Sequence, residues 1–117
     1  MKRQVMIGAT IALLAVSGMA FAHHGWGSYD AGRVMTLENA VTALEWQNPH
    51  VHLAVNHSGE SWDVVLAPPF RMESRGLDPA MIKVGTRIRV VGYPSTKVPR
   101  EMRAERILVD GKTFELR

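Results

Sequence analysis

Apolar residues in this chain follow two patterns, a nearly unbroken run close to the start and short alternating runs after it. The unbroken run extends from Val5 to Met19. From about residue 34 onward, apolar and polar positions alternate in short segments separated by turn residues. A period of two is typical of half-buried β-strands, so the body of the chain is predicted to be all-β.

The clearest local signal is a hairpin in the first half of the chain. Two β-rich runs, Val51 to Asn56 and Ser61 to Ala67, are joined by a segment with turn chemistry, His57 to Glu60. The preceding residues, Val34 to Trp46, are ambiguous, because Leu37, Ala40, Val41 and Leu44 fit helical spacing while the part from Val41 to Trp46 also fits a strand. Because a strand that leads into a hairpin is the simpler context, we expect this stretch to be extended.

The second half predicts one short helix followed by further strands. Two prolines end the third strand, and one or two helical turns are expected before Gly76. Ile88 and Val90 alternate with arginines in a fourth strand, and Gly92 marks a bulge or a sharp bend there. Residues 101–111 are expected to form a fifth strand, and a short last strand follows.

This order of elements predicts the fold class. In the fifth strand, Met102, Ala104 and Ile107 are available for burial, and the last strand covers Lys112 to Leu116. Three strands, a small helix and then two strands is the order of the OB-fold barrel. We therefore predict a small all-β, OB-fold-like barrel of five to six strands, with one short helix between strands 3 and 4.

The start of the chain has the features of an export signal. Two basic residues precede the apolar run, and Ala20, Phe21 and Ala22 follow it with the small-x-small pattern at which signal peptidases cut. The run is shorter than the roughly 20 residues that a membrane-spanning helix needs. We predict a cleaved signal peptide, with an uncleaved N-terminal anchor as the alternative.

Cleavage after Ala22 would divide the chain into three parts and export the protein to the periplasm. Residues 1–22 are the signal peptide, residues 23–33 a glycine-rich N-terminal arm, and residues 34–117 the barrel domain. The mature chain of about 95 residues suffices for one domain, and no later segment is expected to span a membrane. The chain has no cysteine, which excludes disulfides and thiolate metal sites.

Charge is distributed unevenly between the halves of the mature chain. Residues 23–70 contain one basic residue, Arg33, against five acids, whereas residues 71–117 contain eleven bases against six acids. This asymmetry indicates either a surface directed toward an anionic partner or an ordinary solvated face on the later strands.

The five histidines all lie in the first half of the mature chain. His50 and His52 are two apart on a predicted strand, so their side chains should project from one face, roughly 7 Å apart. Two such imidazoles can converge on one metal ion, and a hydrogen-bonded surface pair is the alternative. His57, beside the hairpin turn, is expected to be a surface residue.

Signal cleavage would make His23 the first residue and give it two nitrogen ligands. The α-amine has a pKa near ~8 and the imidazole near ~6.5, so both can lose protons around neutral pH. With an imidazole from His50 or His52, three nitrogens form a T-shaped set that suits Cu(II) better than Zn(II). This set resembles the histidine brace of exported copper proteins. Alternatively, His24 binds together with the amine and the intervening amide, or the terminus is simply solvated.

Several other residues near the histidines have two interpretations. Trp26 either closes a pocket over the metal or pins the arm to the barrel. Tyr29 and Asp30 either contact the metal site beside its main ligands or form part of a turn. Trp46 and Trp62, on adjacent strands, are expected to be core or cross-strand partners.

Enzymatic and nucleic-acid functions find little support in the residues. The chain has no G-x-S-x-G, no cysteine nucleophile and no H-E-x-x-H. Glu45 and Asp63 lie on neighbouring predicted strands, but paired-carboxylate catalysis needs a cleft that so small a barrel seldom offers. The second and third strands are acidic and carry histidines, which is unlike a nucleic-acid surface. We expect no nucleic-acid partner. A non-enzymatic role is favoured, with oxidative copper chemistry as the enzymatic alternative, although no substrate groove is evident.

Landmarks along nearly all of the mature chain carry a family resemblance. They are "AHHGWGSYD", "EWQNPHVHLAV", "SWDVVL", "RGLDPAMIKVGTRIRVVGYP" and "LVDGKTF". With these the chain resembles a family of small exported bacterial proteins classed as a domain of unknown function. The resemblance implies a periplasmic β-barrel-like fold and brings no established activity. The loop "YPSTKVPREMRA" departs from the family, whose members tend to be glycine-rich there.

These observations lead to one functional prediction and one alternative. We predict a periplasmic carrier or sensing module that binds a metal ion, copper, through His23, His24, His50 and His52. The alternative is a metal-free interaction module that binds another exported protein or an anionic ligand.

Overall fold

The computed structural model describes residues 25–117 of the chain. The predicted signal peptide, its cleavage site, His23 and His24 lie outside the described residues. The described elements, in chain order, are η1 (Trp26–Ser28), β1 (Met35–Glu45), β2 (His52–His57), β3 (Glu60–Val65), α2 (Pro69–Ser74), η2 (Pro79–Ile82), β4 (Arg87–Pro94), β5 (Glu101–Val109) and β6 (Lys112–Glu115).

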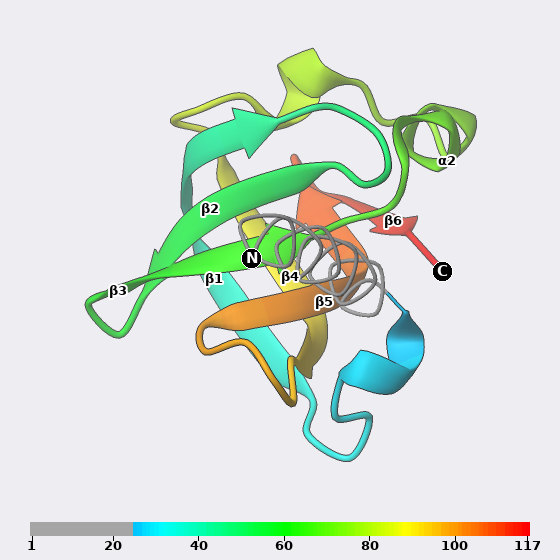
Figure 1. Cartoon of the computed structure of the whole chain (residues 1–117). Helices are drawn as coiled ribbons and strands as arrows, with labels where there is room; N and C mark the ends of the chain where they lie inside the picture. Colours follow the sequence, from blue (N-terminus) through cyan, green and yellow to red (C-terminus); the bar gives the residue numbers. More distant parts are fainter. Residues whose placement is uncertain (1–24) are drawn as a thin grey trace, which may run out of the picture.

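The strands form one sheet that closes into a barrel (Figure 1). Their order is β3-β2-β1-β4-β5-β6, and a parallel pairing between β3 and β5 closes five of them, leaving β6 as an extra strand. Asp63 pairs with Glu101 and Val65 with Arg103 at this closure. The all-β barrel with a short helix between its third and fourth strands is therefore the architecture that was predicted.

The ambiguous first strand owes its helix-like spacing to a β-bulge. β1 pairs with both β2 and β4, and its register to β2 shifts between Val41 and Ala43. Leu37 and Val41 are buried, and Leu44 packs against the same core. Because the bulge adds one residue, the core-facing positions are spaced by four and then three, as they would be in a helix.

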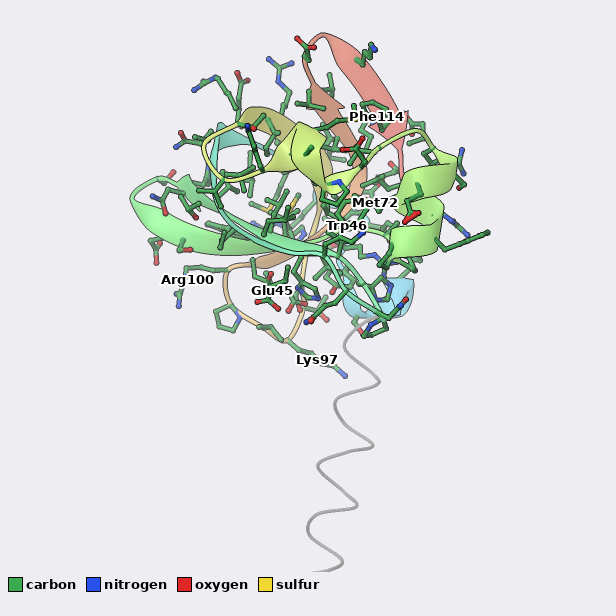
Figure 2. All side chains as sticks on the ribbon, turned by 90° about the horizontal axis from the view of Figure 1, so that it is seen from above. Glu45, Trp46, Met72, Lys97, Arg100 and Phe114 are labelled. Atoms are coloured by element: carbon green, nitrogen blue, oxygen red, sulfur yellow. The ribbon has the colours of Figure 1, made fainter. Side chains whose placement is uncertain are left out.

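The core fills the barrel from all its strands and from the helix. Met102, Ala104 and Ile107 of β5, which were expected to be available for burial, are buried, and Ile88 and Val90 of β4 also face the core. Met72 of α2 is fully buried, and Phe114 of β6 lies beside Gly76, which follows α2 with a positive φ of 90° (Figure 2). The expected bulge at Gly92 is present as a register shift between β4 and β5.

The structure adds two short 3₁₀ helices that the sequence interpretation omitted, η1 in the arm and η2 after α2. The 3₁₀ helix η2 follows α2, and the Asp78 side chain caps it by accepting a hydrogen bond from the Ala80 amide at 2.9 Å. Asp78 followed by Pro79 is a helix-start signal that was available in the sequence.

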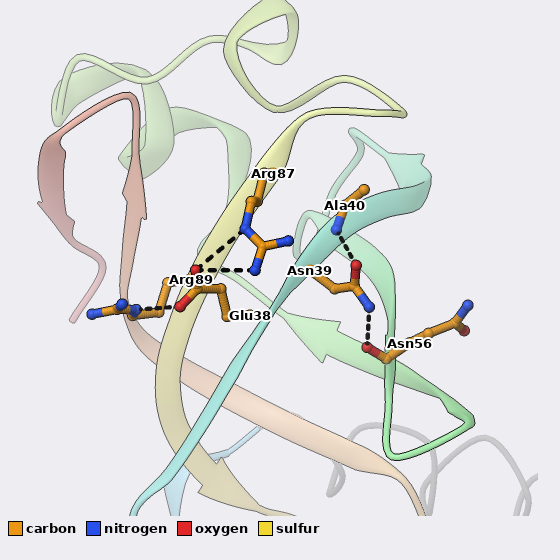
Figure 3. A network of polar contacts seen from close by, with 6 residues as sticks. All are labelled: Glu38, Asn39, Ala40, Asn56, Arg87 and Arg89. Carbon is orange, nitrogen blue, oxygen red and sulfur yellow. Dashed lines mark hydrogen bonds and ion pairs between the residues drawn. The ribbon is translucent and has the colours of Figure 1, made fainter.

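Several acids of the first half form ion pairs with arginines of the second half, because the strands that carry them lie side by side. Glu38 of β1 accepts hydrogen bonds from Arg89 at 2.9 Å and from Arg87 at 3.3 Å, both on β4 (Figure 3). Arg100 lies 3.5 Å from Glu60 at the other side of the barrel. These bases belong to an ordinary solvated face, which was one of the two interpretations of the charge pattern.

Within residues 25–117, no helix has the length and apolar character needed to cross a bilayer.

Candidate functional site

A row of side chains crosses the outer surface of the barrel and links its five closed strands. The register pairs Glu45 with His52, His52 with Val65, Val65 with Arg103, and Arg103 with Tyr93. The neighbours of these residues along the strands, such as Leu53 and Met102, point into the core. Alternation along each strand therefore places the whole row on the outside.

The N-terminal arm covers part of this row. The Asp30 amide donates to the Pro94 carbonyl at 2.9 Å, and the Thr96 amide donates to the Ser28 carbonyl at 2.9 Å. Tyr29 forms an isolated antiparallel bridge with Ser95. The arm is thereby fixed against the loop between β4 and β5, which explains why several outward-facing residues of β3 and β5 are buried. We call the outer surface formed by His52, Asp63, Val65, Glu101 and Arg103 the arm face.

His52 is held by a carboxylate on the neighbouring strand. Its Nδ1 lies 3.0 Å from Oδ1 and 3.3 Å from Oδ2 of Asp63. This hydrogen bond raises the pKa of His52, burial opposes the rise, and the charges of Glu45 and Glu101 add to it. In the neutral imidazole, Nδ1 donates to Asp63 and Nε2 is the nitrogen with metal-binding capacity.

His50 lies just before β2, after the Asn48–Pro49 peptide bond, which is cis. Val51 between the two histidines is fully buried, and its backbone pairs with Leu66 and Ala67. The chain is extended there, so His50 and His52 flank Val51 on the side away from the core. His50 is half-buried, and its Nδ1 is shielded from solvent.

Tyr29 and Glu101 form a buried hydrogen bond under the arm. Tyr29 is 5 % exposed and Glu101 is 7 % exposed, and the Tyr29 hydroxyl donates to Oε2 of Glu101 at 2.8 Å. Burial, followed by the bond to Glu101, raises the pKa of Tyr29 far above its ordinary value. Tyr29 thus anchors the arm.

Asp30 has the turn role considered for it, because its side chain accepts a hydrogen bond from the Gly32 amide at 3.0 Å.

Trp26 holds the first described turn on the barrel. The guanidinium carbons of Arg103 and Arg117 lie 4.3 Å and 4.5 Å from the centroid of its ring. Tyr93 meets the same ring edge-on, with 6.3 Å between centroids. These contacts fit the interpretation that Trp26 pins the arm to the barrel.

The remaining histidine and tryptophans belong to the barrel rather than to the arm face. His57, expected on the surface, is half-buried, because it packs edge-on against Trp62 with 6.2 Å between ring centroids. Trp46 and Trp62 are partly buried against the core, as expected.

Sequence reasoning missed the acidic and basic partners on the arm face. Asp63 was considered only for catalysis, and Glu101 and Arg103 were not singled out. Their positions opposite the core-facing Met102 and Ala104 mark them as outward-facing. The burial of Glu101 and Arg103 depends on the path of the arm, which is distant from β5 in sequence.

The described residues do not by themselves form a metal centre. Within residues 25–117, no three or more His, Asp or Glu side chains are grouped so that they can hold a metal ion. His23 and His24, the other two residues predicted as ligands, lie outside this range.

The comparisons with known proteins place the chain in a family. A search of the curated proteins finds none that matches it. The model of a family of unknown function, DUF6152, matches residues 11–102, and the chain therefore belongs to that family.

Proposed function

We propose that this protein binds one Cu(II) ion at the edge of the arm face and serves as a carrier or sensor in the periplasm. The ligands in this proposal are the α-amine and imidazole of His23, exposed by removal of residues 1–22, and the imidazole of His52. His50 and His24 supply further nitrogens beside them. The observation that carries the proposal is the bond between His52 Nδ1 and Asp63.

A histidine that donates Nδ1–H to a carboxylate is a common arrangement in metal sites. The carboxylate fixes the tautomer and the ring orientation and increases the basicity of Nε2. His52 has this arrangement, with a bond of 3.0 Å, and its side chain remains 23 % exposed. An imidazole held in this way, at the protein surface, suits an ion that must be taken up and passed on.

The length of the arm allows His23 to reach His52. Trp26 is fixed over Arg103, and Arg103 lies two strands away from His52 in the same row. Two strand spacings amount to about 10 Å, and three residues of extended chain span up to about 10 Å. The proposal requires an extended path from Trp26 back to His23, and the two lengths are comparable.

The choice of copper follows from the ligand atoms. An amine and two imidazoles give an all-nitrogen set, and Cu(II) is the strongest binder of such sets in the divalent first-row series. Thiolates, which would favour zinc or Cu(I), are absent because the chain has no cysteine.

The experiment compares two histidine variants of the chain that begins at His23. His52→Gln removes the proposed ligand. His57→Gln is the matched control, because His57 lies on the same strand, packs against Trp62 and is not one of the proposed ligands. Titration with Cu(II), followed by EPR and d–d absorption, should show a one-to-one site. We expect His52→Gln to raise the Kd at least about tenfold, equivalent to 1.4 kcal/mol, and His57→Gln to leave it unchanged. Equal affinities for both variants would contradict the proposal.

Asp63→Asn tests the supporting carboxylate in the same assay. The amide no longer balances the charge of a metal-bound imidazole, so copper affinity should fall by about tenfold to a hundredfold, as is usual for such outer partners. Circular dichroism establishes that the variant is folded. An unchanged Kd in a folded Asp63→Asn variant would show that His52 does not bind the metal through this arrangement.

A further inference from the structure

Glu45, the last residue of β1, lies directly opposite His52 on the outside of the barrel. The two residues are partners in the antiparallel register of β1 and β2. Leu44, the neighbour of Glu45, packs against the core, so the Glu45 side chain points outward. Directly opposed side chains of this kind have Cβ atoms about 5 Å apart. Figure 2 shows Glu45 on the side of the barrel where η1 lies.

The bond to Asp63 directs the second nitrogen of His52 away from β3. β3 and β1 flank β2 on opposite sides. Because Nδ1 lies 3.0 Å from Asp63 on β3, Nε2, on the other side of the ring, is turned away from β3. Glu45 lies on that side of β2. Two ligands of one metal ion, each with a bond of about 2 Å, lie about 3 to 4 Å apart, a separation that these two side chains can reach.

Of the acids near His52, Glu45 is the one available to an ion. Asp63 is bonded to Nδ1, and Glu101 is buried under the arm. Glu45 is exposed, and its carboxylate accepts a hydrogen bond from the neutral Gln47 amide at 3.1 Å. Within residues 25–117, Glu45 takes part in no ion pair. A cation at Nε2 of His52 would therefore meet a carboxylate whose charge is not already neutralised.

We propose that Glu45 is an oxygen ligand of the copper site and makes this site prefer Cu(II) to Cu(I). This role rests on the copper site proposed above. His52 lies between Glu45 and Arg103 in the row across the barrel, and Trp26 of the arm lies over Arg103. The nitrogens of His23 thus approach the ion from the side of Arg103, and the carboxylate of Glu45 approaches it from the opposite side.

A carboxylate ligand changes which oxidation state the site favours. Carboxylate oxygens are hard ligands, and a tetragonal set of nitrogen and oxygen atoms is typical of Cu(II). Cu(I) is selected by soft sulfur ligands instead. The negative charge of Glu45 also balances one of the two positive charges of Cu(II). Removal of this carboxylate should therefore weaken the binding of Cu(II) much more than that of Cu(I).

The experiment titrates Cu(II), and separately Cu(I) without oxygen, into the chain that begins at His23. Glu45→Gln removes the carboxylate, and Glu73→Gln on α2 is the matched control for the loss of one charge. We expect Glu45→Gln to raise the Kd for Cu(II) at least about tenfold and the Kd for Cu(I) less than about twofold. The midpoint potential of the bound copper should then rise by about 59 mV for each tenfold difference between the two changes. Glu73→Gln should change neither Kd.

High salt separates a ligand from a carboxylate that attracts the ion at a distance. At an ionic strength of about 1 M the screening length falls to about 3 Å, so a distant carboxylate has little effect on the Kd. We expect the effect of Glu45→Gln to persist in this salt and to be accompanied by a change in the copper hyperfine splitting in EPR. An effect that disappears at high salt would overturn the assignment of Glu45 as a ligand.

The outcomes for three variants distinguish this inference from the copper site on which it rests. A loss of Cu(II) affinity in His52→Gln, with equal affinities in Glu45→Gln and Glu73→Gln, would remove Glu45 from the site and leave the site itself standing. Equal losses of Cu(II) and Cu(I) affinity in Glu45→Gln would contradict the preference for Cu(II). No loss in His52→Gln would contradict the copper site, and the role of Glu45 with it. Because Glu45 is exposed at the end of its strand, Glu45→Gln should fold, which circular dichroism of the metal-free protein checks.

Discussion

The Asp63 carboxylate makes His52 a pH-sensitive residue. Since the pKa of His52 is higher in the folded than in the unfolded chain, the pair stabilises the fold fully below about pH 6.5. This contribution is lost as pH rises through the folded pKa. Asp63→Asn should therefore destabilise the protein more at about pH 5.5 than at about pH 8.5 in urea unfolding. A larger loss at the higher pH would contradict the assigned pair.

The same titration limits copper binding, because a doubly protonated imidazole has no lone pair for a metal. NMR titration of the metal-free protein should give His52 a pKa above that of an ordinary imidazole, and Asp63→Asn should lower it. A His52 pKa at or below about 6.5 in the unsubstituted protein would contradict the pairing.

Gly92 is required by the close approach of β4 and β5 at their bulge. A Cβ there would overlap the Arg103 carbonyl oxygen and lie 2.8 Å from the Cα of Ala104, and backbone atoms cannot move aside easily. Gly92→Ala should destabilise the protein by about 3 kcal/mol in urea unfolding. Gly27→Ala is the control, because among residues 25–117 no atom beyond its chain neighbours lies within 4 Å of the added Cβ. Similar losses for both substitutions would show that the bulge is not the cause.

At the scale of elements, the arm depends on Tyr29 for its position. Tyr29→Phe removes the donor to Glu101 and leaves that carboxylate buried with one hydrogen bond fewer, at a cost of about 1 to 3 kcal/mol. Hydrogen exchange at the Asp30 amide, which donates to Pro94, should become faster than exchange in β2. Unchanged exchange at Asp30 would mean that backbone bonds alone hold the arm.

The elements also show where prediction from the sequence succeeds. Alternation and turn chemistry predicted the hairpin, the helix and the last three strands, because each depends on local pattern. β1 stayed ambiguous because its bulge depends on pairing with β2 and β4, which is not a local property. The arm was predicted only as a glycine-rich segment, because its anchoring depends on Glu101, which lies 72 residues beyond Tyr29.

At the scale of the whole molecule, one core joins the closed barrel, the helix and the extra strand. Phe114 of β6 is 9 % exposed and belongs to this core. Phe114→Ala should cost about 3 kcal/mol, and unfolding should remain a single transition with the same midpoint by tryptophan fluorescence and circular dichroism. Two separate midpoints would show that β6 is not part of the cooperative unit.

Parts of the candidate site depend on how the whole barrel closes, and these parts could not be predicted from the sequence. The placement of His50 and His52 on one face follows from strand period and could be predicted. The pairing of His52 with Asp63 requires the hairpin register, and the meeting of Asp63 with Glu101 requires closure of the barrel between β3 and β5. Contacts of this kind depend on topology, which alternation along single strands does not specify.

The central claim is that a histidine exposed at the start of the mature chain completes a copper site with His52. The most direct test compares Cu(II) affinity of the chain that begins at His23 with that of a chain carrying one glycine before His23. We predict that the extension, which separates the amine from the His23 imidazole, raises the Kd more than about tenfold. Equal affinities, or weak binding by both chains, would contradict the claim.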